Sequence, residues 1–156
     1  MILRWEQGRS SVDALLARGQ LTRVVPNSEL AERMLQQAQA HLASAATIVE
    51  TDPTGAFVLA YDGARKALAS ILINQGLRAG GDGAHAVLLE VVLAQLDPPL
   101  GGTFRPFSWM RPLRNHTEYP SPDYPVAQQV DVAEAIPLAA EMIEVATKVI
   151  GQMPTY

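Results

Sequence analysis

Apolar residues recur at steps of three and four along most of this chain, and glycines and prolines interrupt them. That spacing places apolar side chains on one face of an α-helix, whereas a half-buried strand needs alternation at every second residue. No alternating segment of useful length and no internal repeat occurs in the sequence. The pattern therefore predicts an all-α protein with helices that end near the glycines and prolines.

The segment 28–52 predicts a long helix that is capped by Asn27 or Ser28 and stops before Pro53. Its expected apolar face consists of Leu30, Met34, Ala38, Leu42, Ala45 and Val49. The next helix is expected over 55–75 and ends at Gly76. A ridge of small residues on this second helix would let another helix approach closely: Ala56, Ala60, Gly63 and Ala67.

Three further helices are expected. A short helix follows an N-cap at Ser10 or Ser11 and ends before Gly19. After a flexible loop at 77–83, the segment 84–96 is apolar on more than one side, which is typical of a buried helix. In the last helix, within 128–153, Pro137 should introduce a kink or mark the true start. The core face of that helix consists of Val132, Ile136, Ala139, Ile143, Ala146 and Val149. With the segment 104–120, these helices predict a compact bundle of five or six helices.

The composition narrows the classes of function. Hydrophobic residues make up 48% of the 156 residues and charged residues 18%, which is typical of one globular domain. A formal net charge of −4 argues against a general nucleic-acid coat or a polybasic membrane anchor. The absence of cysteine excludes disulfides and thiolate chemistry. The charged start, MILRWEQGRS, does not resemble a signal peptide, and no apolar stretch is long enough to span a bilayer, so we expect a cytoplasmic protein.

The segment FRPFSWMRPLRNHTEYP, residues 104–120, is the part of the sequence most suited to chemistry. It combines the arginines Arg105, Arg111 and Arg114 with His116 and four aromatic rings, and its single acid is Glu118. Arginine binds phosphate through planar, charged hydrogen bonds, and histidine exchanges protons near neutral pH. The segment is therefore either a functional site or a basic patch on the core.

Other motifs carry weaker signals. His41, His85 and His116 are far apart in sequence and lack the spacing of metal ligands, so we expect no metal site and no cofactor. The glycines in GGDGAH, residues 80–85, follow a helix and lack the Lys-Ser/Thr pair of a phosphate loop, which favours a hinge. Asp62 lies at helical spacing from Arg65 and Lys66, which predicts ordinary surface ion pairs.

Three features together resemble the HEPN superfamily of helical bundles. An alanine-rich helix carries Arg65 and Lys66 and runs into Gly76, His85 opens the next helix after a loop, and Arg114 precedes the polar Asn115 in a late helix. The resemblance covers roughly residues 28–150. The RN..EYP ending of the segment is similar to that of a group of bacterial members of the superfamily. The resemblance implies an HEPN-like domain over 28–156 and an added helical extension over 1–27.

Active members of that superfamily carry an arginine followed by four to six residues and a histidine. The resemblance implies that two chains pair so that both motifs face one cleft, and that RNA is cut without a metal. Many members are encoded beside a minimal nucleotidyltransferase in toxin–antitoxin or defence loci. Such a partner, RNA or a nucleotide, and a homodimer through the helices that carry the motif are therefore expected.

Two registers fit the motif in this sequence. Arg111 and His116 satisfy the bare spacing, but Pro112 follows the arginine. Arg114 and Tyr119 have the same spacing and keep the polar Asn115, which favours this register although tyrosine replaces histidine. A phenol with an ordinary pKa of about 10 is a poor base near neutral pH. We therefore expect binding through Arg105, Arg111, Arg114, Asn115 and Tyr119, with cleavage weakened or lost.

Helix geometry separates Arg114 from His116. At about 100° per residue, Arg111, Arg114, Asn115 and Glu118 share one face, and His116 lies roughly 200° from Arg114. His116 would need a helix break or a second chain to join Arg114 at one phosphate. Glu118, four residues after Arg114, could instead pair with it, in which case the patch is structural. Under that reading Phe104, Phe107 and Trp109 simply seal the end of the bundle.

Two alternative functions remain open at this point. One is an active, metal-independent endoribonuclease toxin that uses Arg111 or Arg114 with His116 as catalytic residues. The other is a protein-interaction module in which the patch docks a nucleotidyltransferase antitoxin. The setting in defence, stress or toxin–antitoxin control follows from the resemblance alone.

Overall fold

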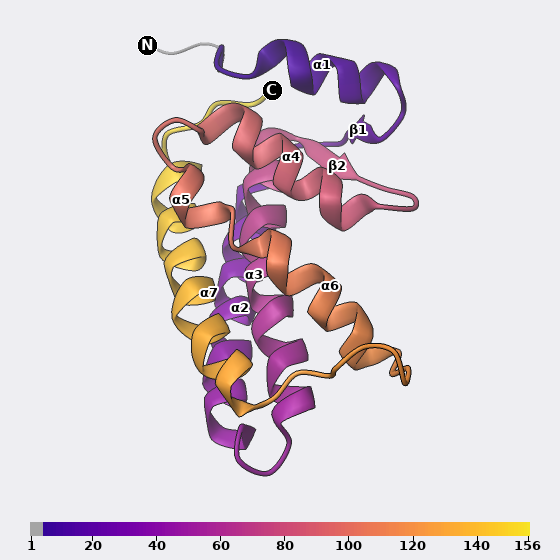
Figure 1. Cartoon of the computed structure of the whole chain (residues 1–156). Coiled ribbons are helices and arrows are strands. Elements are labelled where there is room, and N and C mark those ends of the chain that lie inside the picture. Colours follow the sequence, from indigo (N-terminus) through magenta and orange to yellow (C-terminus); the bar gives the residue numbers. More distant parts are fainter. Residues whose placement is uncertain (1–4) are drawn as a thin grey trace.

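The structure, a computed structural model, describes residues 5–156. Residues 1–4, the start of the segment whose charges argue against a signal peptide, lie outside the described residues. Three long helices, α2 (Ser28–Ile48), α3 (Pro53–Gln75) and α7 (Gln129–Ile150), run side by side (Figure 1). Helix α6 (Phe107–Glu118) lies along α3, while α1 (Arg9–Ala17) and α4 (Ala84–Leu96) cover one end of the bundle.

Helix α3 is the centre of the fold and contacts α2, α4, α6 and α7. Asp52 caps its first turn by accepting a hydrogen bond from the Gly55 amide at 2.9 Å, and Pro53 occupies the first turn. Gly76, with a φ of 83°, ends the helix as the sequence predicts. The expected ridge of small residues is buried along its whole length, from Ala56 to Ala67.

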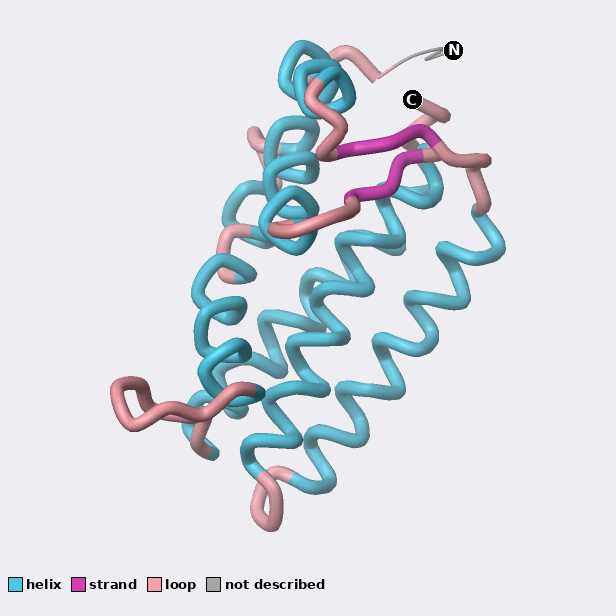
Figure 2. Tube along the Cα trace, turned by 90° about the vertical axis from the view of Figure 1, so that its right-hand side faces the viewer, coloured by secondary structure: helices cyan, strands magenta, loops and turns pink. Residues whose placement is uncertain are grey.

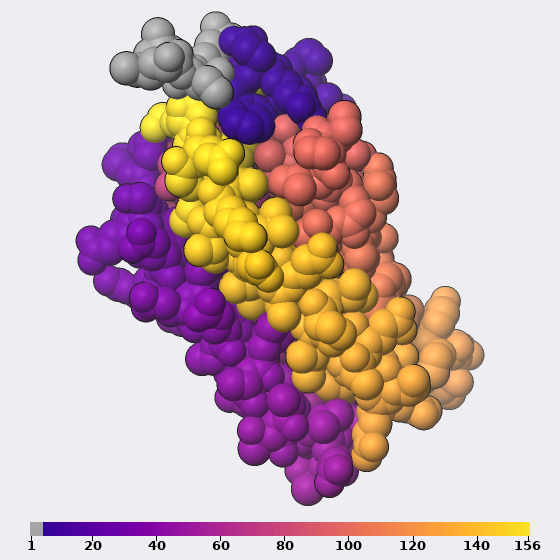
Figure 3. Space-filling view, turned by 90° about the vertical axis from the view of Figure 1, so that its left-hand side faces the viewer, coloured from indigo at the N-terminus to yellow at the C-terminus, as the bar shows by residue number. Residues whose placement is uncertain are grey.

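Helix α2 begins after an Asn27 cap, as expected, because the Asn27 side chain accepts a hydrogen bond from the Leu30 amide at 2.9 Å. Its buried stripe differs from the prediction at the N-terminal end, where Ala31 and Leu35 face the core and Leu30 is exposed. The stripe is displaced because α2 packs against both α3 and α7. On the face seen in Figure 3, α7 lies between α2 and the segment that follows α4.

A two-stranded ribbon contradicts the expectation of a chain without strands, and its second strand occupies the first three residues of the loop expected at 77–83. Strands β1 (Leu21–Arg23) and β2 (Leu77–Ala79) pair antiparallel, with Thr22 opposite Arg78. The ribbon lies across the ends of the long helices (Figure 2). Strands of three residues are too short to show alternation in a sequence, which explains why the pattern missed them.

Hydrogen bonds of residues near the two chain ends fix helix α1 to the rest of the protein. The Trp5 indole donates to the Gln95 carbonyl at 3.0 Å, and the Tyr156 hydroxyl donates to the Asp13 carboxylate at 2.6 Å. The predicted N-caps Ser10 and Ser11 are wrong, since both lie inside the helix and Gly8, with a φ of 75°, precedes it. Gly19 does follow its end, as predicted.

The last helix extends through Pro137, which therefore does not mark its start. The Asp131 side chain fixes the N-terminus instead, because its carboxylate accepts a hydrogen bond from the Gln128 backbone amide at 2.8 Å. The short helix α5 (Gly101–Phe104) joins α4 to α6. Within residues 5–156, six helices have nine or more residues, which confirms the predicted all-α bundle. None of these described helices is long and apolar enough to cross a membrane.

We predict that Gly63→Leu destabilises the bundle by about 1–3 kcal/mol, because a Cβ at Gly63 would lie 3.2 Å from both the Ala38 carbonyl and a Leu42 methyl group. The free energy of unfolding in urea measures the effect. Gly102→Leu is the matched control, because nothing lies within 4 Å of the corresponding Cβ position. Equal stability of both variants would show that α2 and α3 do not need a glycine at their contact.

Candidate functional site

The arginines of α6 face a polar cleft with a volume of about 330 Å³. One wall is the α6 segment with Arg111, Arg114 and Asn115, and the other is the turn 81–83 with the start of α4, including His85. Two segments that are separated in the sequence by residues 87–110 therefore form one site. The predicted face of α6 is thus confirmed for Arg111, Arg114 and Asn115, which lie together.

Neither Arg111 nor Arg114 pairs with a carboxylate among residues 5–156. Both side chains are half-buried. Arg114 makes only a long hydrogen bond to the Asn115 side chain, at 3.4 Å, and its buried Nε has no partner in the described part of the chain. The ion pair with Glu118 that the structural alternative requires is absent there, and Glu118 lines a separate hollow with Asp52. Two neighbouring cations therefore remain available to an anion.

The opposite wall is the glycine-rich turn. Gly81 and Gly83 have positive φ angles of 76° and 77°, a conformation that side-chain-bearing residues rarely adopt. No side chain caps the N-terminus of α4, so the positive end of its dipole lies at the cleft. Asp82, an exposed acid on the same turn, also lines the cleft and opposes an anion. The turn predicted as a hinge is therefore part of the site.

His85, rather than His116, is the histidine near Arg114. Its Nδ1 lies 2.7 Å from the hydroxyl of Tyr61, a buried residue of α3. The Arg114 guanidinium lies over the Tyr61 ring, 5.7 Å from its centroid, and Phe107 stacks on the same ring at 5.1 Å. When His85 is neutral and Tyr61 donates to Nδ1, the imidazole proton sits on Nε2.

Burial and nearby cations shift both ionisable groups of this pair. Burial raises the pKa of Tyr61 to about 12, against the opposing effect of Arg114, Arg111 and Arg65. Burial also lowers the pKa of His85, and the positive charges of Arg65 and Arg114 lower it further. Near neutral pH the site therefore holds a neutral phenol and a neutral imidazole beside two arginines.

A cluster of oppositely charged side chains surrounds Asp62 on α3. Arg65 donates to the Asp62 carboxylate from Nε at 2.9 Å and from Nη2 at 2.7 Å, and the Lys66 and His41 nitrogens each lie 3.5 Å from it. Burial acts to raise the pKa of Asp62, but the hydrogen bonds and charge of Arg65 outweigh it, and the pKa is lowered. The predicted Asp62 pairs are confirmed, although they are half-buried rather than fully at the surface.

The remaining predicted residues do not reach the cleft. The His116 ring stacks on Tyr124, with 4.0 Å between centroids, and Tyr119 lies just beyond the end of α6 with 73% of its surface exposed. Arg105 pairs with Asp97. The structure thus brings Arg111, Arg114 and Asn115 together, and it separates them from Arg105, His116 and Tyr119.

Three of the four aromatic residues of the segment pack in or against the core, as the structural interpretation predicts. Phe104 and Phe107 are fully buried, and Trp109 packs against Phe57 with 6.1 Å between ring centroids. Sequence reasoning missed Tyr61 and His85 as site residues. Two sequence signals could have identified them: a tyrosine within a ridge of small residues, and a histidine in the first turn after a glycine loop.

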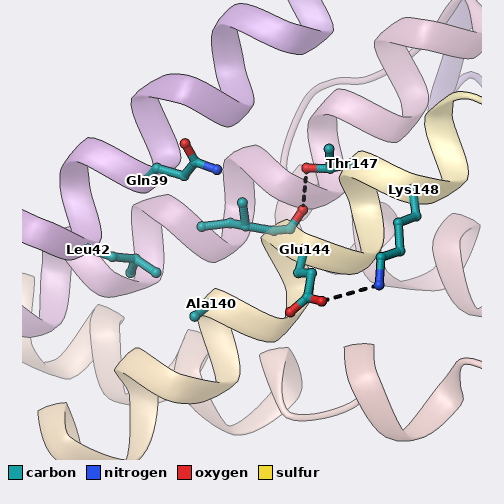
Figure 4. A pocket seen from close by; sticks show the side chains of 7 residues that line it. Gln39, Leu42, Ala140, Glu144, Thr147 and Lys148 are labelled. Carbon is teal, nitrogen blue, oxygen red and sulfur yellow. Dashed lines mark hydrogen bonds and ion pairs between the residues drawn. The ribbon is translucent and has the colours of Figure 1, made fainter.

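A second hollow, between α2 and α7, does not have the features of a site. Figure 4 shows its lining by Gln39, Leu42 and Ala140, with Glu144 bonded to Lys148 at 3.2 Å. The Thr147 hydroxyl is also occupied, since it donates to the Ile143 carbonyl at 2.7 Å. Because the two charged side chains of this hollow pair with each other, we place the candidate site at the arginine cleft.

No group of three or more His, Asp or Glu side chains within residues 5–156 is arranged to hold a metal ion. Searches against protein-family models, curated proteins and solved structures found no match for this chain. The chemistry of the cleft therefore rests on its own residues: two arginines that can bind an anion and a neutral imidazole that can accept a proton.

We predict that the thermal stability of the wild type falls more steeply than that of His85→Gln between pH 7 and pH 5. The pKa of His85 is lowered in the folded chain, so the unfolded chain, with an ordinary pKa of about 6.5, binds more protons in this range. Stability from this group is therefore present above pH ~6.5 and is lost as the pH falls. Circular-dichroism melts measure the difference.

His116→Gln serves as the control for this titration, because that ring stacks on Tyr124 outside the cleft. Parallel pH profiles of the wild type and His85→Gln would contradict the assignment of this titration to His85.

Proposed function

We propose that this chain is a divergent HEPN-domain protein that binds a phosphate group of RNA or of a nucleotide in the arginine cleft, with cleavage weakened or lost. The observation that supports this most strongly is the pair of half-buried arginines, Arg111 and Arg114, without carboxylate partners among residues 5–156. A phosphate would supply the charge and the hydrogen-bond acceptors that these side chains lack. A defence, stress or toxin–antitoxin setting belongs to the same proposal.

The roles within the cleft follow from the chemistry of each group. Arg114 and Arg111 donate to the phosphate oxygens, and the Asn115 amide adds a neutral hydrogen bond. The uncapped start of α4 favours the same negative charge. We infer that Tyr119 and Arg105, which lie outside the cleft, add at most contacts to a longer RNA.

The position of His85 favours a second candidate function, metal-independent RNA cleavage. A neutral imidazole with a lowered pKa can accept the proton of a ribose 2′-hydroxyl, and Arg114 can stabilise the charge that develops on the phosphate. One chain contributes a single histidine to this cleft. The proton for the leaving oxygen would come from a second group, and a homodimer paired through α6 would supply one.

We predict that Arg114→Gln weakens binding of a 12-nucleotide single-stranded RNA by about tenfold or more, because a charged hydrogen bond to phosphate is lost. The slope of log affinity against log salt should also decrease by about 0.7 for each lost contact. Fluorescence anisotropy measures both quantities, with a nucleoside monophosphate as competitor. Asp82→Asn should strengthen binding, since it removes the acid of the cleft.

Arg33→Gln is the matched control, because Arg33 lies on the exposed side of α2 and pairs with Glu29. Equal losses for Arg33→Gln and Arg114→Gln would show that binding depends on overall charge and not on this cleft. If RNA fails to bind and a nucleotidyltransferase co-purifies, the proposal is wrong and the protein is instead an interaction module that docks this partner.

We expect that the wild type leaves a mixed RNA substrate uncut in EDTA, because no second histidine lines the cleft among the described residues to donate a proton to the leaving oxygen. Gel electrophoresis of the products tests this against His85→Ala and His116→Ala. Cutting that disappears only in His85→Ala would establish the second candidate function. Cutting that disappears only in His116→Ala would show that Arg111 and His116 form the catalytic motif.

A further inference from the structure

An apolar pocket of about 280 Å³ lies beside the arginine cleft. It is enclosed by α2, α3, β2 and the start of α4, and its walls are aliphatic, including Leu30, Met34, Leu72, Leu77 and Leu88. Its volume is slightly below the roughly 300–1,000 Å³ of ordinary ligand pockets, which favours a small occupant. Buried aliphatic walls bind the apolar part of a ligand by removing it from water.

Three nitrogen-bearing side chains line the same pocket: Arg65, Arg78 and His85. No carboxylate is among the lining residues. Arg65 uses Nε and Nη2 to hold Asp62, and its Nη1 makes no hydrogen bond within residues 5–156. Arg78 is exposed and has no ion pair in that part of the chain. The pocket thus combines an aliphatic interior with free guanidinium donors of Arg65 and Arg78.

We propose that this pocket binds a small aliphatic anion, a short hydrocarbon chain with a single carboxylate or phosphate head. The chain occupies the leucine-lined interior, and the head binds Arg65 and Arg78. This inference goes beyond the phosphate site proposed above, since it concerns a different cavity. The two cavities meet at Ala84 and His85, which line both.

A chain-length series tests the apolar part of the proposal. Calorimetric titration of the full chain with butanoate, hexanoate and octanoate should show affinity that rises about two- to fourfold for each added methylene until the pocket is full. Octyl phosphate tests whether the head is a phosphate rather than a carboxylate. Octanol tests the charge, and it should bind at least tenfold more weakly than octanoate. No gain with length, or equal binding of octanol, would overturn the proposal.

Variants locate the ligand in this pocket. Ala69→Phe places a ring in the lining and should abolish the gain from the longer chains, whereas Ala140→Phe, in the hollow between α2 and α7, should leave it unchanged. Arg78→Gln should reduce octanoate affinity by about three- to tenfold, and Arg33→Gln should not. Because Arg78 is exposed, its variant remains informative even if Ala69→Phe fails to fold. Unchanged affinity in Arg78→Gln would remove the anion-binding role.

Octanoate binding and RNA binding test the two proposals separately. Ala69→Phe, if folded by circular dichroism, should keep its RNA affinity, because Ala69 does not line the arginine cleft. RNA binding without any octanoate binding would refute only the aliphatic-anion pocket. Octanoate binding without RNA or nucleotide binding would refute only the function proposed for the cleft.

Discussion

The close packing of α3 against its neighbours is the constraint on which the rest of the structure depends. Gly63 lets the α2 backbone approach so closely that even a methyl group would lie 3.2 Å from the Ala38 carbonyl. Because α3 contacts four other helices, small side chains are needed along it, and most of its buried positions are small or aliphatic. Tyr61 departs from this pattern, and its hydroxyl requires a polar partner inside the protein.

That requirement explains how the core determines the geometry of the cleft. The Tyr61 hydroxyl is bonded to His85, which fixes the start of α4, and its ring is stacked on Phe107, which fixes the start of α6. The Arg114 side chain lies over the same ring. One buried residue of α3 therefore contacts both walls of the site. The imidazole and the guanidinium are held by packing, as a preorganised binding site requires.

The sequence predicts what is local and periodic, and it misses what depends on contacts between distant segments. The sequence predicts the helices, the Asn27 cap and the end of α3 at Gly76, because each depends on neighbouring residues. The shared face of Arg111, Arg114 and Asn115 follows from the helical period. The three-residue strands and the place of His85 beside Arg114 depend on how the chain packs. A spacing rule within one helix selects His116, which stacks on Tyr124 instead.

The distribution of charge supports a functional interpretation of the cleft more strongly than a structural one. Arg65 is half-buried and holds Asp62 with two hydrogen bonds. Arg111 and Arg114 are similarly buried but have no carboxylate partner in residues 5–156, although Glu118 is available one turn from Arg114. Partial burial of a cation without a counterion is unfavourable. The phosphate proposed for this cleft would supply the missing counterion to both cations.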